Sequence, residues 1–395
     1  MRHHVVIVSA VRTPIGRFGG SLKSVTSGDL AALVVGEAVK RAGITGEMVD
    51  EVILGEVRQS SESSNVARVA ALRAGIPAEA PAFTVNRLCA SGMQAVASGV
   101  QQIAFEQASV VIAGGTENMS RAPIYLRNAR FGEGNPYIVD SNLENGQQPM
   151  EIYGSHLGMG MTAENVAEKY GISREDQDKF AYESQMKAAA ALREGKFDAE
   201  IVPVEVKEKK ATVLFAKDEF PRPDTTLEGL AKLKPAFKEG GTVTAGNACG
   251  RNDGAAAMVI MSEQKAKELG LKPLARIVDW TAAGVSPEIM GVGPVPAVRK
   301  LLKRVNMSLD DIGLVELNEA FAAQALAVVR ELGIKPEVLN VNGGAIALGH
   351  PLGATGARIM VTLLHEMMRR KEQFGLATLC VGGGQGMAVL LELMP

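Results

Sequence analysis

Residues 80–117, APAFTVNRLCASGMQAVASGVQQIAFEQASVVIAGGTE, place Cys89 between a strand-like run and a helical repeat. Residues 80–88 have the short apolar pattern of a strand, and residues 108–117 form a second such run. Between them apolar side chains recur every three or four residues, as on an amphipathic helix: Met93, Val96, Ala97, Val100 and Ile103. The order strand, turn, helix, strand predicts a layered α/β fold.

The rest of the chain repeats this order of elements. Residues 4–14, 30–44 and 50–57 predict strand, helix and strand, and residues 274–393 follow the same alternation. We expect a duplicated α/β unit, with a first half over residues 1–118 and 250–272 and a second half over 273–395. Residues 119–249 interrupt this alternation: they begin with a stretch of low periodicity, and two helix-like runs follow, of which residues 173–195 are the clearer. An insertion of this length is typical of a functional segment that covers a substrate.

Composition excludes several classes of partner. The 395 residues carry a net charge of -2 with one Trp and five Tyr, which predicts no nucleic-acid partner. No run approaches the roughly 18 to 20 apolar residues that span a bilayer, and the N-terminus lacks a signal-peptide core, so we expect no membrane partner. Three cysteines without a C-x-x-C pair argue against disulfides and a zinc site. We therefore expect a cytoplasmic protein.

Cys89 is the first candidate for chemistry. A helix N-terminus supplies free N–H groups and a partial positive charge, which favour the nucleophilic thiolate. The small residues Ala90, Ser91 and Gly92 leave room for a substrate. The alternative is a buried cysteine that acts as a small hydrophobe, and its position alone leaves both interpretations open.

Three further segments carry candidate groups. His350 lies among glycines in residues 340–358, where a neutral imidazole can take a proton or donate to an oxyanion, unless it is a surface loop residue. Cys380 precedes Gly382 in LCVGGGQGM, whose glycines suit an oxyanion hole. The same glycines partly resemble a dinucleotide loop, but a strand rather than a helix follows them. Asn318 either caps a helix or holds a water or substrate oxygen.

The segments NRLCASGMQAV, NEAFAAQ, NGGAIALGHPLGATGAR and LCVGGGQG resemble the four main motifs of the thiolase family, in that family's order. TVTAGNACGRNDGAAAM and MTAENVAEKYGISREDQD resemble further family segments, so the resemblance covers essentially the whole chain. It is closest to the acetyl-CoA acetyltransferases. It implies duplicated α/β units with five-stranded mixed sheets in an α-β-α-β-α layering, plus an inserted loop domain.

The resemblance also implies roles for the candidate residues. Cys89 would attack an acyl-CoA thioester and hold the acetyl group, while His350 accepts the thiol proton. Cys380 would act as acid and base toward a second acetyl-CoA. One oxyanion hole would be formed by the N–H groups of Cys89 and Gly382, and the other by His350 with a water held by Asn318. No metal or redox cofactor is implied, because coenzyme A is substrate and product.

The coenzyme A site implied by the resemblance lies largely in the insertion, at His156, Arg222, Phe237 and Ala245. Alternatively, Arg222 is a solvated surface arginine, and Phe237 and Phe321 are core residues. The remaining positions would line the pantetheine and acyl end of the site: Cys249, Met290, Ala320 and Phe321.

Two departures from the family pattern bear on the site and on assembly. Cys249 stands where the family usually has serine, and a thiol is a weaker hydrogen-bond donor. Residues 58–71 lack the glycines that are common in a stretch near the family's dimer interface. The resemblance implies a homo-oligomer, either a dimer or a homotetramer.

The leading expectation is an acyltransferase that reversibly condenses two acetyl-CoA molecules to acetoacetyl-CoA and CoA. The alternative is a degradative 3-ketoacyl-CoA thiolase of fatty acid metabolism that takes longer chains. A non-catalytic relative would be expected to lose Cys89, His350 or Cys380, and all three are present. A decarboxylating ketoacyl synthase would carry a second histidine in place of Cys380.

Overall fold

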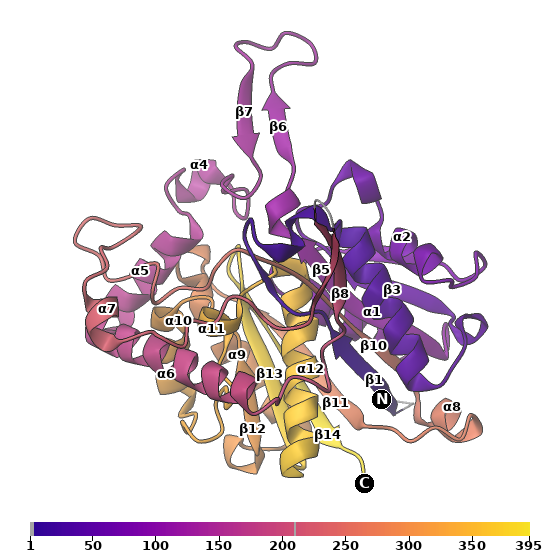
Figure 1. Cartoon of the computed structure of the whole chain (residues 1–395). Helices are drawn as coiled ribbons and strands as arrows, with labels where there is room; N and C mark the ends of the chain where they lie inside the picture. Colours follow the sequence, from indigo (N-terminus) through magenta and orange to yellow (C-terminus); the bar gives the residue numbers. More distant parts are fainter. Residues whose placement is uncertain (1–3, 209–210) are drawn as a thin grey trace.

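The computed structural model describes residues 4–208 and 211–395. A ten-stranded sheet runs through its centre in the order β12-β13-β14-β11-β1-β10-β5-β3-β4, with β2 paired to β10 (Figure 1). Its first-half strands are β1 (Val5–Arg12), β2 (Gly16–Arg17), β3 (Glu51–Gly55), β4 (Ala82–Val85), β5 (Val110–Asn118) and β10 (Asn252–Ser262). Those of the second half are β11 (Ala275–Gly284), β12 (Leu314–Leu317), β13 (Phe374–Val381) and β14 (Gln385–Leu393).

Helices lie on both faces of this sheet. The first half contributes α1 (Ser27–Ala42), α2 (Val66–Arg73), α3 (Ser91–Ala104) and α8 (Glu263–Glu268). The second half contributes α9 (Pro294–Val305), α10 (Ala322–Leu332), α11 (Ala345–Leu348) and α12 (Leu352–Arg370). None of the described helices combines the length and hydrophobicity needed to cross a bilayer.

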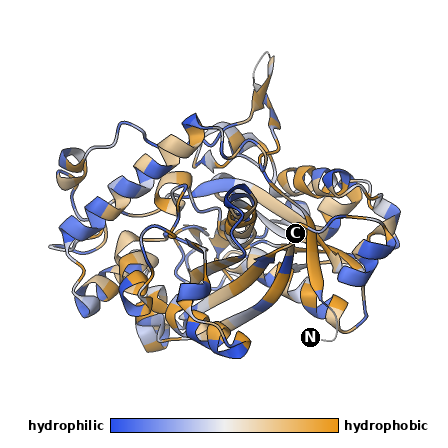
Figure 2. Ribbon diagram, turned by 90° about the horizontal axis from the view of Figure 1, so that it is seen from below, coloured by the Kyte–Doolittle hydropathy of each residue, from blue (hydrophilic) through white to orange (hydrophobic). Residues whose placement is uncertain are grey.

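The packing follows the α-β-α-β-α order that the resemblance implied. Helices α3 and α12 pack against each other in the middle layer, where their apolar faces meet strands of both halves. Helices α1 and α2 cover the outer face of the first half, and α9 and α10 that of the second. In Figure 2 the central strands are largely orange, whereas blue and orange turns alternate on the surrounding helices, as expected of helices with one buried face.

The two halves differ from a pair of separate five-stranded sheets. They join edge to edge through β1 and β11, which pair at Val5–Ile277, Val6–Arg276 and Ile7–Ala275. The second half contributes four strands, and a single bridge between Val315 and Leu339 stands where a fifth strand was expected. The chain turns away from β12 at Asn340, whose φ of 41° ends the extended conformation.

Glycines allow α3 and α12 to approach closely. A Cβ added to Gly92 would lie 2.8 Å from the carbonyl oxygen of Gly353 and 2.9 Å from the backbone nitrogen of Ala357. Ala90, Ser91 and Gly92 are all buried and lie outside the lining of the cavity at Cys89. The expectation that these small residues leave room for a substrate was therefore wrong, because the space belongs to the neighbouring helix.

The segment between the halves carries its own elements. These are β6 (Ile124–Arg127), β7 (Tyr137–Asp140), α4 (Met150–Tyr153), α5 (Met159–Tyr170), α6 (Arg174–Arg193), β8 (Val204–Glu208), β9 (Ala211–Phe215) and α7 (Leu227–Ala231). The β6–β7 hairpin projects from the body of the molecule at the top of Figure 1. Apolar side chains on it are exposed: Ile124, Leu126, Phe131, Tyr137 and Ile138.

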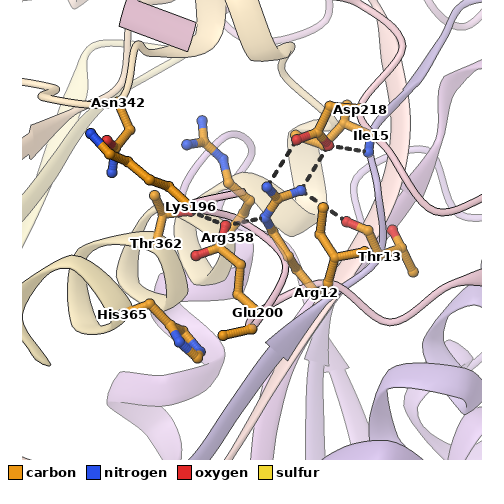
Figure 3. Close-up of polar contacts among 12 residues, drawn as sticks. Arg12, Thr13, Ile15, Lys196, Glu200, Asp218, Asn342, Arg358, Thr362 and His365 are labelled. Carbon is orange, nitrogen blue, oxygen red and sulfur yellow. Dashed lines mark hydrogen bonds and ion pairs between the residues drawn. The ribbon is translucent and has the colours of Figure 1, made fainter. Parts of the chain in front are cut away.

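A buried ionic cluster ties this segment to both halves (Figure 3). Arg12, at the end of β1, donates from Nε to Glu200 at 2.6 Å and from its two terminal nitrogens to Asp218 at 2.8 and 2.9 Å. Thr362 on α12 donates to Glu200 at 3.0 Å. Because Arg12, Glu200 and Asp218 each have a hydrogen-bonded partner, these three charges tolerate burial and fix Glu200 and Asp218 against β1 and α12.

Candidate active site

One cavity of about 680 Å³ collects the sequence candidates from both halves and from the segment between them. Of the residues expected to carry chemistry, it is lined by Cys89, His350, Cys380 and Gly382. Of those expected to contact coenzyme A, it is lined by His156, Arg222, Phe237, Ala245, Cys249, Met290, Ala320 and Phe321. Asn318 is the one candidate that is not part of this lining.

Cys89 sits in the predicted strand-to-helix junction. Strand β4 ends at Val85 and α3 begins at Ser91. Leu88 has a φ of 46°, an uncommon conformation for a non-glycine residue, and the Asn86 side chain accepts its backbone N–H at 2.9 Å. The Ser91 hydroxyl accepts from Arg87 N–H and donates to the Leu88 carbonyl. This bonded turn holds the thiol just ahead of the helix.

Burial of the Cys89 sulfur opposes its ionisation, whereas nearby backbone N–H groups favour it. Burial is the largest effect and raises the pKa of the thiol. The backbone N–H groups of Gly382 and of Cys89 itself face the sulfur and lower the pKa, but do not cancel the effect of burial. A thiol in this position needs a base to become a nucleophile.

His350 is fixed by its backbone as well as by its ring. It lies between α11 and α12, after Gly349, whose φ is 106°. A Cβ on Gly349 would lie 2.4 Å from the Asn252 side chain, so only glycine fits there. The Asn252 Oδ1 atom accepts the His350 backbone N–H at 3.0 Å. His350 is buried, so the interpretation as a surface loop histidine was wrong.

The hydrogen bonds of the His350 ring determine its tautomer. Nδ1 lies 2.7 Å from Thr355 Oγ1, and the Thr355 hydroxyl donates its only proton to the Pro351 carbonyl at 2.8 Å. Nδ1 must therefore carry the hydrogen, which leaves Nε2 with a free lone pair. Nε2 is buried and has no hydrogen-bond partner among the described residues. Burial lowers the pKa of His350 to about 3, so the ring is neutral.

Cys380 and its glycines close the other side of the cavity. Cys380 lies near the end of β13, and Gly383 and Gly384 have φ values of 76° and 85° in the turn to β14. Burial raises the pKa of the Cys380 thiol, and the proximity of the sulfurs of Cys89 and Cys249 raises it further. Burial, and then the charge of Cys89, raise the pKa of Cys249 to about 12.

Asn318 follows β12, and its side chain is buried with no hydrogen-bond partner for Nδ2 or Oδ1 among the described residues. Helix α10 begins at Ala322 after Phe321, so the expectation that Asn318 caps a helix was wrong. A buried amide without partners is costly unless it binds water or a ligand, which agrees with the alternative expectation of a held water.

The residues expected to contact coenzyme A divide by exposure. His156, Arg222, Phe237 and Ala245 are exposed at the mouth, while Met290, Ala320 and Phe321 are buried deeper. The rings of Phe237 and Phe321 meet edge to face at 6.1 Å, and Arg222 stacks over Phe220 at 5.3 Å. Phe237 is therefore not a core residue.

Sequence reasoning missed several residues that hold this site together. Asn252 and Thr355 position His350, although both lie inside motifs quoted above. Glu117 accepts the backbone N–H groups of Val57, Arg58 and Gly353, which joins the loop after β3 to the first turn of α12. Asn252 and Glu117 bind backbone N–H groups far away in the sequence, and Thr355 binds the His350 ring five residues away. A single sequence carries no signal for these pairings.

The fold and the site define a duplicated α/β enzyme with three cavity thiols, and the comparisons agree. Residues 5–264 match the thiolase N-terminal domain and residues 271–393 the thiolase C-terminal domain, so the chain belongs to the thiolase family. It is 52% identical to the acetyl-CoA acetyltransferase of Syntrophomonas wolfei over the full length of both chains.

Solved structures give the same result. The Bacillus anthracis acetyl-CoA acetyltransferase matches with a TM-score of 0.97 and 52% identity, covering 100% of this chain and 99% of that one. Human mitochondrial 3-ketoacyl-CoA thiolase in complex with CoA matches with a TM-score of 0.94 and 46% identity, covering 100% and 98%. The thiolase fold implied by the sequence motifs is thereby confirmed.

Proposed function

We propose that the protein is an acetyl-CoA C-acetyltransferase that condenses two acetyl-CoA molecules to acetoacetyl-CoA and CoA, or runs the reverse thiolysis. The observation that carries this proposal is the cavity shared by Cys89, His350 and Cys380, which come from both halves of the fold. The full-length similarity to acetyl-CoA acetyltransferases supports the acetyl substrate.

In the first half-reaction the free lone pair of His350 Nε2 takes the Cys89 proton as the sulfur attacks the thioester carbonyl. A carbon–sulfur bond forms to Cys89 and the bond to coenzyme A breaks. The CoA thiolate takes the proton of the Cys380 thiol and leaves, while His350 keeps the Cys89 proton on Nε2. The N–H groups of Cys89 and Gly382 that face the sulfur are placed to stabilise the oxyanion.

In the second half-reaction the Cys380 thiolate removes a proton from the methyl group of a second acetyl-CoA. The resulting carbanion attacks the acetyl carbon on Cys89, and the Cys89–acetyl bond breaks to release acetoacetyl-CoA. Cys89 leaves as the thiolate and recovers its proton from His350 Nε2, while Cys380 keeps the methyl proton as a thiol. Until then the Nε2–H of His350, with a water held by the unpartnered Asn318 amide, would stabilise the enolate oxygen.

Coenzyme A is substrate and product in this proposal. Arg222 and His156 at the mouth suit its phosphates and adenine, and Phe237, Met290 and Phe321 suit its apolar arm. We assign residues 119–249 as the covering insertion, between the halves 1–118 with 250–272 and 273–395. A cytoplasmic location stays a prediction from sequence.

We infer a homo-oligomer, and the projecting β6–β7 hairpin supports it. Ile124, Phe131 and Ile138 on this hairpin are 69%, 81% and 74% exposed, which is unfavourable for a lone subunit in water. Among the strands that the structure describes, β4 pairs only with β3 and leaves a free sheet edge. Analytical ultracentrifugation distinguishes a dimer from a tetramer by the mass of the assembly.

The test is a thiolysis assay over 3-oxoacyl-CoA chain lengths from acetoacetyl-CoA upward, on wild type and Cys89→Ala. The proposal expects the best kcat/KM with acetoacetyl-CoA and a loss of at least about 1,000-fold in the variant, as for removal of a covalent nucleophile. A strong preference for long chains would instead assign the degradative 3-ketoacyl-CoA reaction. Equal rates in both proteins would overturn the mechanism.

A further inference from the structure

Arg58 places a positive charge in the reacting end of the cavity. Its backbone N–H and that of Val57 bind the carboxylate of Glu117, which also binds the backbone N–H of Gly353, three residues beyond His350. The side chain lines the same cavity as Cys89 and is close enough to act on the charge of its sulfur. Arg58 therefore lies beside the acyl group that Cys89 would hold.

No described residue forms a hydrogen bond or ion pair with the guanidinium of Arg58, although its charge is close enough to Glu117 to oppose the rise that burial causes in the pKa of that carboxyl. Its Nε atom is buried without a hydrogen-bond partner, and no ion pair joins it to any carboxylate that the structure describes. Both oxygens of Glu117, a nearby acid, already accept backbone N–H groups. Of the described residues that line the cavity, none is Asp or Glu.

Arg58 differs in this respect from the other two arginines of the cavity. Arg222 stacks over Phe220 at 5.3 Å and Arg251 over Phe18 at 4.9 Å, and both are exposed. Those two suit the phosphates of coenzyme A, which lie at the far end of the pantetheine arm from the reacting sulfur. Arg58 is half-buried, has no aromatic neighbour of this kind, and lies at the sulfur end.

The difference between Arg58 and the two exposed arginines indicates which kind of acyl group the cavity suits. A buried guanidinium donor is stabilised by an anionic oxygen pair, which it binds in a planar, charge-assisted geometry. The methyl group of an acetyl chain has no oxygen beyond the thioester and leaves Arg58 unpaired. A chain that ends in a carboxylate supplies the missing acceptor without removing any group used in the reaction.

We propose that, among 3-oxoacyl-CoA substrates longer than acetoacetyl-CoA, Arg58 selects those whose acyl chain ends in a carboxylate. The proposal rests on the thiolase activity proposed above. In thiolysis Cys89 Sγ bonds to C3, the C2–C3 bond breaks, and C2 takes a proton from Cys380 and leaves as acetyl-CoA. The chain with its carboxylate stays on Cys89, beside Arg58, until the thiol of a second CoA replaces the Cys89 sulfur at C3 and returns the proton to the enzyme.

The experiment measures thiolysis of matched pairs of six- and eight-carbon 3-oxoacyl-CoA esters that end in a methyl group or in a carboxylate. Wild type is expected to prefer the carboxylate member by about tenfold or more in kcat/KM at one or both lengths. In Arg58→Met the ratio of the two rates is expected to fall about 10- to 100-fold, and Arg58→Lys to retain part of the preference. Because both substrates are assayed with the same enzyme, the ratio of the two rates does not depend on the fraction of protein that is folded.

Arg193→Met is the matched control, because Arg193 is exposed at the end of α6, outside the cavity lining, and its variant should keep the wild-type ratio. No preference in wild type at either length, or an unchanged ratio in Arg58→Met, overturns the proposal. If Arg58→Met weakens subunit association and leaves the ratio unchanged, Arg58 belongs to a subunit interface instead. Absence of acetoacetyl-CoA thiolysis by wild type contradicts the proposed function itself, so the two failures are distinguishable.

Discussion

The Nδ1 atom of His350 lies 2.7 Å from the hydroxyl oxygen of Thr355, whose own proton is committed to the Pro351 carbonyl. The threonine hydroxyl is therefore an acceptor toward the imidazole. This single bond leaves the lone pair of His350 on Nε2, the ring atom without a partner among the described residues. The basicity that the mechanism needs depends on a residue that need not touch the substrate.

Thr355→Val should lower kcat about tenfold or more, because the valine cannot accept from Nδ1–H and the productive tautomer loses its preference. Thr355→Ser should keep most of the activity, since serine supplies the same oxygen. Burst kinetics of Cys89 acetylation measure the step directly. Equal acetylation rates in the valine and serine variants would show that Thr355 has only a packing role.

The pH dependence of the same burst gives a second readout. Because burial lowers the pKa of His350 to about 3, the base stays unprotonated through the region of an ordinary histidine. The wild-type acetylation rate should show no inflection near pH 6.5. A titration near that value, retained in Thr355→Ser, would mean that His350 is more solvated than its surroundings indicate.

The contact between α3 and α12 sets the separation of Cys89 and His350, so Gly92→Ala should harm both stability and activity. The added Cβ would lie 2.8 Å from the Gly353 carbonyl oxygen. We expect about 1–3 kcal/mol loss in the free energy of unfolding, measured by urea denaturation.

Gly36→Ala is the control for the Gly92 substitution, because Gly36 is also a glycine within a helix but lacks the close contact. A Cβ on Gly36 of α1 would meet only the Cβ of Ala74, at 3.8 Å. That variant should gain about 0.5–1 kcal/mol from helix propensity. The same gain at Gly92 would show that the two helices tolerate a wider separation.

Glu56→Gln should remove a pH dependence of stability. Burial, followed by the charge of Glu117, raises the pKa of Glu56 from 4.5 to about 8, and its Oε2 has no partner among the described residues. Between these values the unfolded chain is ionised while the folded chain stays protonated, so the free energy of unfolding falls as pH rises from about 5 to 8.

The glutamine variant stays neutral in both states and should escape that fall. Its advantage over wild type should be about 3 kcal/mol greater at pH 8 than at pH 5.5 in urea unfolding. Parallel pH profiles for the two proteins would mean that Glu56 ionises normally in the folded state.

The local elements around the reactive groups could be predicted from sequence. The apolar spacing after Cys89 predicts α3, and the glycines around His350 and Cys380 predict the turns that the structure contains. Local periodicity and turn chemistry decide these features, and both are readable in one chain.

Structural features that depend on contacts between distant segments of the chain could not be predicted from the sequence. Gly92 makes room for α12 rather than for a substrate, and the sequence does not state which helix will lie against it. The unpaired state of Arg58 likewise depends on which carboxylates the fold brings near it. The edge-to-edge joining of the halves at β1 and β11 depends on only three residue pairs.

The central claim is that Cys89 carries the acetyl group between the two half-reactions. Its most direct test is mass spectrometry of peptides from the wild-type protein quenched in acid after brief exposure to acetyl-CoA. The account predicts an acetyl adduct on the peptide that contains Cys89, lost when CoA is added before the quench. An adduct on the Cys380 peptide, with Cys89 unmodified, would contradict it.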